Sequence, residues 1–163
     1  MANAPIIRKS LPNERSEVTE RIIAVAIEAH SHLGPGRLER SYEEALCIEV
    51  RLRRLRFERQ RGIRALYKGH DIGDFQLDLV VESLVVVELK AIERIAPVHL
   101  AQLVSYLRSI DLPLGLLINF NQSRLIDGVS RRLNPRCSLI QSLPDSPPSL
   151  SQPSHSSEFH PEE

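Results

Sequence analysis

Residues 75–90 read FQLDLVVESLVVVELK, and this stretch decides the fold. Two apolar segments flank a short connection, which predicts two antiparallel strands joined by a tight turn. Asp78 interrupts the first strand, and Glu88 and Lys90 interrupt the second. Because residues i and i+2 of a strand point the same way, Glu88 and Lys90 share one face. An ionised carboxylate buried alone is costly, so these acids need a partner or a cation.

The length of the turn decides whether the charges meet. Paired residues of an antiparallel hairpin have a constant index sum, and Asp78 opposite Glu88 gives 166. That sum requires a three-residue connection at 82–84, whereas a two-residue turn at 82–83 gives 165 and sends Asp78 to the opposite face. We therefore expect a three-residue turn or an equivalent bulge, with Val87 facing away from the charges.

Two carboxylates on adjacent strands suit a hard divalent cation. Mg²⁺ typically binds one or two protein carboxylates together with waters and substrate phosphate. Water activated by such a metal is a better nucleophile. Lys90 can orient that water or neutralise charge that develops on a phosphate. The same residues also fit a purely structural cluster of Asp78, Lys90 and Glu88 at the end of the sheet.

The elements around this hairpin follow from periodicity and turn residues. We expect a helix capped by Ser16 that ends at GPG (34–36), a helix at 38–55, an Arg-rich edge strand at 57–67, strands at 75–81 and 84–90 after the turn segment KGHDIGD, a helix at 98–109, a strand at 114–120, and a weak helix or extended segment at 122–133. The helix before the last strand predicts a crossover, so that strand joins parallel to a neighbour. The fold class is α/β, a mixed four-stranded sheet with flanking helices.

Length and composition set the domain organisation. The 163 residues fit a single domain at 16–139, with a loose arm at 1–15 and a disordered Ser/Pro-rich tail at 140–163. The sequence contains no apolar run of about 18 residues and no leader-like apolar segment, which excludes a membrane-spanning class. Cys47 and Cys137 lack metal-site spacing, so we expect reduced thiols in a cytoplasmic protein.

The basic residues are unevenly distributed. The last 22 residues carry four acidic groups and no Lys or Arg, so the other 141 carry 21 basic and 17 acidic groups, a net of +4. Seven of the 21 fall between Arg51 and Arg64, including Arg59 and Arg61, and only Glu58 opposes them there. Such a run forms either a solvated face or a patch that contacts phosphates.

The spacing D…ELK within residues 78–90 resembles the motif of the PD-(D/E)XK nuclease superfamily. That superfamily has a restriction-endonuclease-like αβββαβ core, the order given above with one extra N-terminal helix. Upstream, GPGRLERSYEEAL carries Gly36, Glu39 and Tyr42 and resembles the GxxExxY signature of a small bacterial family in that superfamily. The resemblance extends over roughly residues 16–133.

Downstream segments extend the resemblance. AQLVSYL carries Gln102 and Tyr106 and resembles the QxxxY element of the RecB-like branch, and LLINF at 116–120 is also typical of the GxxExxY family. One segment departs from it, because Arg61 and Arg64 stand among positions that are usually apolar in the first strand. These arginines and Arg59 would supply positive charge towards phosphates.

The resemblance implies a role for each residue of the motif. Asp78 and Glu88 would be the main metal ligands, and the main-chain carbonyl of Leu89 would be a third. Glu39 would reach the metal directly or through water, or would help to hold a second ion. Lys90 would position the attacking water.

Gln102 and Tyr106 have two possible roles, and the other residues of the motifs have structural ones. Gln102 and Tyr106 lie four residues apart on one helical face and would support the site or contact the nucleic-acid backbone. Alternatively, Tyr106 belongs to the core and Gln102 caps a polar group. We expect Tyr42 to pack, Gly36 to supply backbone freedom at the start of the second helix, and His99 to lie at the surface or at a helix start.

The sequence therefore predicts a metal-dependent nuclease that hydrolyses phosphodiester bonds of nucleic acid, expected to be DNA, with Mg²⁺ or Mn²⁺ as cofactor and no membrane partner. Two alternatives stay open. One is a catalytically silent nucleic-acid-binding module of the same fold. The other is a regulatory interaction protein in which the Ser/Pro tail contacts a partner.

Overall fold

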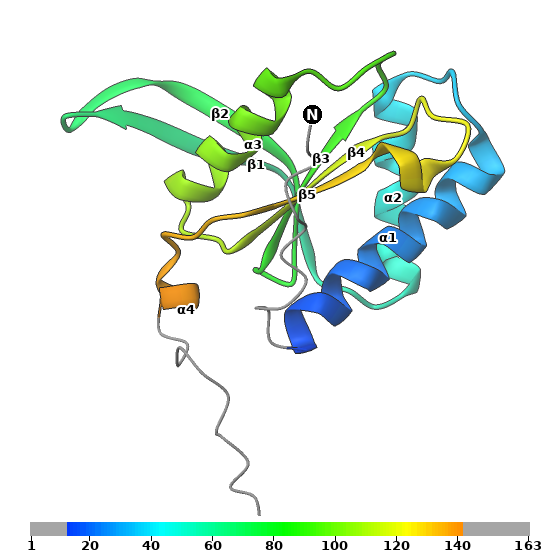
Figure 1. Cartoon of the computed structure of the whole chain (residues 1–163), viewed down its shortest axis with the longest axis horizontal. Helices are drawn as coiled ribbons and strands as arrows, with labels where there is room; N and C mark the ends of the chain where they lie inside the picture. Colours follow the sequence, from blue (N-terminus) through cyan, green and yellow to red (C-terminus); the bar gives the residue numbers. More distant parts are fainter. Residues whose placement is uncertain (1–12, 142–163) are drawn as a thin grey trace, which may run out of the picture.

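The computed structural model describes residues 13–141, where one five-stranded mixed sheet carries helices on both faces (Figure 1). The elements are α1 (Asn13–Leu33), α2 (Glu39–Leu52), β1 (Phe57–Tyr67), β2 (His70–Val81), β3 (Val85–Lys90), α3 (Pro97–Ser109), β4 (Leu114–Asn119), the 3₁₀-helix η1 (Leu125–Gly128), β5 (Val129–Leu133) and α4 (Ser138–Gln141). The strands lie in chain order from β1 to β5. β3 and β4 run parallel and the other neighbours antiparallel, which confirms the α/β class and the crossover through α3.

The fifth strand is a difference from the four that were expected. β5 pairs antiparallel with β4, from Leu114 opposite Leu133 to Ile118 opposite Val129. Its sequence, VSRRL, has no strict alternation of apolar and polar residues, and every residue in it is partly exposed. A half-covered edge strand of this kind carries little of the periodic signal that identifies strands.

Several element ends also differ from expectation, and the helix expected at 38–55 ends at Leu52. α1 begins at Asn13, so it starts before Ser16 and enters the segment that was expected to be a loose arm. The turn segment is short, because β2 begins at His70 and only Lys68 and Gly69 separate it from β1. α4 reaches Gln141, within the expected tail; the rest of both terminal segments lies outside the described residues. None of the helices between residues 13 and 141 has the length and apolar character needed to cross a bilayer.

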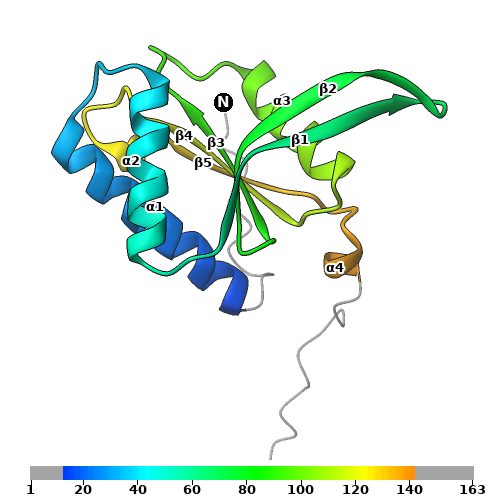
Figure 2. The ribbon, with the colours of Figure 1, turned by 180° about the vertical axis from the view of Figure 1, so that it is seen from behind.

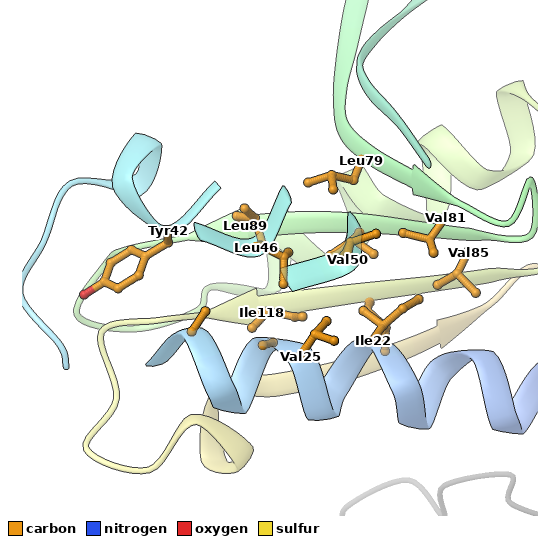
Figure 3. Close-up of a cluster of buried hydrophobic side chains, with 14 of the residues drawn as sticks. Ile22, Val25, Tyr42, Leu46, Val50, Leu79, Val81, Val85, Leu89 and Ile118 are labelled. Carbon is orange, nitrogen blue, oxygen red and sulfur yellow. The ribbon is translucent and has the colours of Figure 1, made fainter. Parts of the chain in front are cut away.

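Each face of the sheet has its own hydrophobic core. α1 and α2 cover one face, and their apolar residues pack on alternate residues of β3, Val85, Val87 and Leu89. Figure 3 shows Val85 and Leu89 among the side chains of α1 and α2. α3 covers the other face and packs on Val86, with Leu117 of β4 beside it. β3 is thus buried on both sides, which explains the continuous apolar run from Val85 to Val87 before Glu88. Glu88 and Lys90 have the same parity as Val86, so their side chains point to the face of the sheet that α3 covers.

The connection between β2 and β3 has the length that gathers the charges. Leu79 pairs with Val87 and Val81 with Val85, a constant sum of 166 that confirms the three-residue turn. Glu82 and Ser83 have positive φ values of 53° and 52°, an uncommon conformation for residues other than glycine. The Glu82 carboxylate accepts a 2.7 Å hydrogen bond from the backbone N–H of Arg56, which ties the turn to the start of β1.

β1 and β2 continue well beyond the sheet as a two-stranded arm, which we define as residues 61–75. The pairing of β2 with β3 ends at Leu79 and Val87, whereas the pairing of β1 with β2 runs on to Tyr67 and His70. The arm therefore projects from the body of the molecule, and α3 lies along its base (Figure 2). β1 is the expected edge strand.

The two strands exchange faces where the arm begins. Phe57 in β1 and Leu79 in β2 pack with the α1–α2 core, whereas Ile63 and Leu77, of the same parity, belong to the α3 core. Between them Gln60 has a positive φ of 50°. The pairing sum stays at 138 from Arg59 with Leu79 to Arg61 with Leu77, so no residue is inserted at this point, and the register shift of β1 and β2 lies further out, at Ala65/Leu66.

Candidate active site

Asp78 lies where β2 separates from β3. Its Oδ2 accepts a 2.7 Å hydrogen bond from the backbone N–H of Leu89. The N–H and C=O of one strand residue point to the same side, so the Leu89 carbonyl also points towards β2. The carbonyl of the next residue, Lys90, points the other way and accepts from Phe120 N–H at 2.7 Å. Asp78 and the expected carbonyl ligand therefore lie on one side of β3.

Glu88 is the most unusual group of the site. It is only 6% exposed, and its Oε1 has no hydrogen-bond partner among the described residues. The pKa of Glu88 is raised from 4.5 to about 8, chiefly by burial and then by the Asp78 carboxylate, while Lys90 opposes the shift. A buried acceptor without a donor is a destabilising arrangement that needs an explanation.

Three carboxyl groups share the same electrostatic environment. Burial is the main reason that the pKa of Asp78 is raised, and the Leu89 N–H and Lys90 oppose that shift. The pKa of Glu39 is also raised by partial desolvation and by Asp78, again against Lys90. The three groups that the sequence proposed as neighbours are thus brought together, with Lys90 as their common counter-charge.

The loop before α2 places Glu39. Gly36 has a φ of 89°, the left-handed region expected for it. The Tyr42 hydroxyl donates to the Gly34 carbonyl at 2.6 Å and accepts from Arg37 N–H at 3.0 Å. The Tyr42 ring is fully buried and stacks on Phe120 at 4.6 Å. Tyr42 therefore packs, as expected, and it holds the loop that starts the helix of Glu39.

Gln102 and Tyr106 form a hydrogen-bonded pair on α3, with Tyr106 in the core. Tyr106 is buried in the α3 core, and its hydroxyl accepts a 2.7 Å hydrogen bond from Gln102 Nε2. Burial raises the pKa of Tyr106, and the nearby charges of Glu88 and Asp78 add to this shift. The pair thus lies beside the carboxyl groups, with Gln102 exposed to solvent.

His99 and the arginines complete the sequence-predicted set. His99 is the third residue of α3, where its Nδ1 accepts from Ala96 N–H at 3.0 Å, so it belongs to the helix start. Arg59 does not point freely to solvent, because it binds Glu43 at 2.7 Å and Glu44 at 2.8 Å on α2. Arg61 and Arg64 lie on the arm, in longer ion pairs of 3.3 Å with Glu58 and 3.6 Å with Asp71.

Sequence reasoning missed Glu43 and Gln60. Glu43 is 8% exposed, and its Oε1 accepts from Arg59 at 2.7 Å and from Gln60 Nε2 at 2.8 Å. The same amide lies 3.5 Å from Asp78 Oδ1. Gln60 therefore links α2 to Asp78. Glu43 directly follows Tyr42 in the predicted helix, beside the apolar residues that this helix buries. That position was the signal in the sequence.

The donor set fits a hard cation. Between residues 13 and 141, no three His, Cys, Asp or Glu side chains are arranged to hold a metal alone. Two carboxylates with a main-chain carbonyl form an all-oxygen set, which Mg²⁺ and Mn²⁺ prefer. The unpaired Oε1 of Glu88 is the atom for which such an ion would provide a partner.

A mixed sheet whose central hairpin brings two acids and a lysine to one end is the architecture of the restriction-endonuclease-like fold. A family model described as the PD-(D/E)XK nuclease superfamily matches residues 16–132, and the chain belongs to this superfamily. No curated protein and no solved structure matches the chain. Membership points to a nuclease with a nucleic-acid substrate and a divalent metal.

Gln60→Ala tests the link between α2 and Asp78. We expect the Kd for Mn²⁺ to rise about tenfold, since residues that orient metal ligands usually have effects of this size. The free energy of unfolding should fall by roughly 1 kcal/mol through the lost hydrogen bond to Glu43. Calorimetric Mn²⁺ titration and urea unfolding measure the two effects. Gln76→Ala, at an exposed β2 position, is the control, and equal Mn²⁺ affinity in both variants would contradict the link.

Proposed function

We propose that this protein is a metal-dependent nuclease that hydrolyses phosphodiester bonds of DNA, using Mg²⁺ or Mn²⁺, and that it belongs to the GxxExxY family within its superfamily. The observation that carries the proposal is the buried, unpartnered Oε1 of Glu88 beside Asp78 and Lys90. Such an arrangement weakens a merely structural protein, whereas a bound cation would stabilise it.

The residues divide into holding and reacting groups. Asp78, Glu88 and the carbonyl of Leu89 would hold the ion, and Glu39 would contact it directly or through water. When bound, a divalent cation supplies Lewis-acid stabilisation of phosphate charge and a more acidic water. The contacts of Asp78 with Leu89 N–H and Gln60 orient its carboxylate before any ligand arrives.

Lys90 is the group that acts on the substrate. It is partly exposed at the end of β3, and its charge lowers the pKa values of Glu39, Asp78 and Glu88. An ammonium group in this position can orient water and neutralise developing phosphate charge. Gln102 donates to Tyr106 and is exposed beside the carboxyl groups, which suits a contact with the nucleic-acid backbone.

The proposal is tested by cleavage assays with the full chain on linear and circular duplex DNA, single-stranded DNA and RNA. We expect cleavage of duplex DNA in Mg²⁺ or Mn²⁺, no cleavage with a chelator, and a loss of at least about a hundredfold in Asp78→Asn. Glu17→Gln, at an exposed position on α1, should match the parent. Parent-like cleavage by Asp78→Asn would exclude this site, and binding without cleavage would favour the catalytically silent module.

A further inference from the structure

The end of the arm carries exposed apolar side chains. Leu66 is 62% exposed, Tyr67 60% and Ile72 64%. They surround the two-residue turn, where the Lys68 ammonium lies 5.5 Å from the centre of the Tyr67 ring. We call residues 66–72 the arm tip. Large apolar groups gathered on a projecting hairpin are typical of a contact surface.

The arm is braced rather than free to swing. Ile63 and Phe75, on its two strands, pack with the α3 core. The Phe75 ring lies 5.3 Å from the ring of Tyr106, the same tyrosine whose hydroxyl lies beside the carboxyl groups. The direction of the arm is therefore set by the residues that form the base of the candidate active site.

The arm has a defined reach from that site. β2 runs from Asp78 to His70 at about 3.4 Å per residue, so the tip lies roughly 27 Å away along the strand. Stacked base pairs repeat at about 3.4 Å, so this reach corresponds to roughly eight base pairs. A nucleic acid held at the carboxyl groups could therefore lie along the whole arm.

We propose that the β1–β2 arm is a duplex-binding element that lies in the major groove on one side of the cleaved phosphate, with the arm tip as its far contact. A two-stranded ribbon has the right width for that groove. Over its whole length, residues 61–75, the arm carries Arg61, Arg64 and Lys68 against Asp71 and Asp74, a net charge of +1, and Lys68 lies at the tip, where it can meet a phosphate. This inference rests on the proposed function, because the active site anchors the duplex.

A protein partner explains the tip less well. A stable interface buries about 800 Å² on each partner, well beyond what three exposed side chains provide. The tip also alternates apolar side chains with Lys68, His70 and Asp71, whereas the core of a protein interface is depleted of charge. Apolar contact with thymine methyl groups and stacking on bases are interactions that a small mixed tip can make.

The test compares two double variants for binding to a labelled duplex of about 20 base pairs, by fluorescence anisotropy with Mg²⁺ in the slowly cleaving Lys90→Met background, so that the ion which anchors the duplex stays bound. Tyr67→Ser/Ile72→Ser removes the tip contacts, and Ile48→Ser/Leu52→Ser removes two equally exposed apolar groups from α2. We expect the Kd of the tip variant to rise about tenfold and that of the α2 variant to stay near the parent value. All three proteins should unfold at the same temperature, since each side chain is exposed.

Duplex length provides the second measurement. Duplexes that extend fewer than about eight base pairs on the arm side should bind the parent and the tip variant equally. Equal affinity of parent and tip variant for long duplexes, or no duplex binding by the parent, would overturn the proposal. So would a tip-dependent dimer in sedimentation, which would make the tip a self-association surface. Tip-dependent binding without any cleavage would retain the arm and reject the nuclease.

Discussion

Glu88→Gln is expected to abolish cleavage and, at the same time, to stabilise the metal-free protein at pH 8. Burial raises the pKa of Glu88 from 4.5 to about 8, so the folded protein keeps a proton that the unfolded chain loses. The unfolded state then binds fewer protons between these two values, and the free energy of unfolding falls as pH rises through this range. Glutamine has the same shape and no charge, so it escapes this loss.

Urea unfolding at pH 5 and pH 8 with a chelator measures the effect. We expect the parent to lose on the order of 3 kcal/mol more than Glu88→Gln between these pH values. Mg²⁺ should restore the stability of the parent at pH 8 and leave the variant unchanged, because metal binding to the folded state stabilises it. Glu17→Gln should follow the parent in every condition. A parent whose stability does not depend on pH would show that Glu88 is solvated.

Lys90→Met is expected to reduce cleavage by about a hundred- to a thousandfold while the protein still folds and binds duplex DNA. The side chain is partly exposed, so its loss costs little packing. Lys90 lowers the pKa values of Asp78 and Glu88, so its removal raises both further. The residual activity should therefore need a higher pH than that of the parent.

The pH dependence of the cleavage rate separates this effect from simple loss of charge. Lys90→Met should shift the rising limb upwards, whereas Lys68→Met, on the arm tip, should weaken duplex binding without moving that limb. Lys90→Arg keeps the charge but replaces a compact ammonium by a planar group, so only partial recovery is expected. A Lys90→Met variant with the rate and pH dependence of the parent would remove Lys90 from the mechanism.

The central hairpin was predictable because its charged residues have a fixed parity. The paired segments 79–81 and 85–87 are apolar on both faces, so burial alone admits either register, and only the three-residue turn gathers Asp78 with Glu88. The crossover followed from a strongly periodic helix before β4.

The parts that escaped prediction depend on contacts between distant segments. β5 has no periodic signal because it lies at a half-covered edge. The positive φ of Gln60 belongs to a residue type that rarely adopts it, so nothing in the segment indicates the exchange of faces. The sequence predicted that Arg59 contacts phosphates. Its ion pairs with Glu43 and Glu44 could not be predicted, because they form only when α2 packs beside β1.

The three-residue turn after β2 has a consequence for how this protein can change over generations. Amino-acid replacements at Glu82 or Ser83 alter the strain of the turn, but they leave the pairing sum of 166 intact. Deletion or insertion of one residue there would reverse the parity and separate Asp78 from Glu88. Natural selection should therefore remove gene variants that gain or lose one codon in this turn far more strictly than variants with a substitution there. This should hold even though the turn lies at the opposite end of the hairpin from the carboxyl groups.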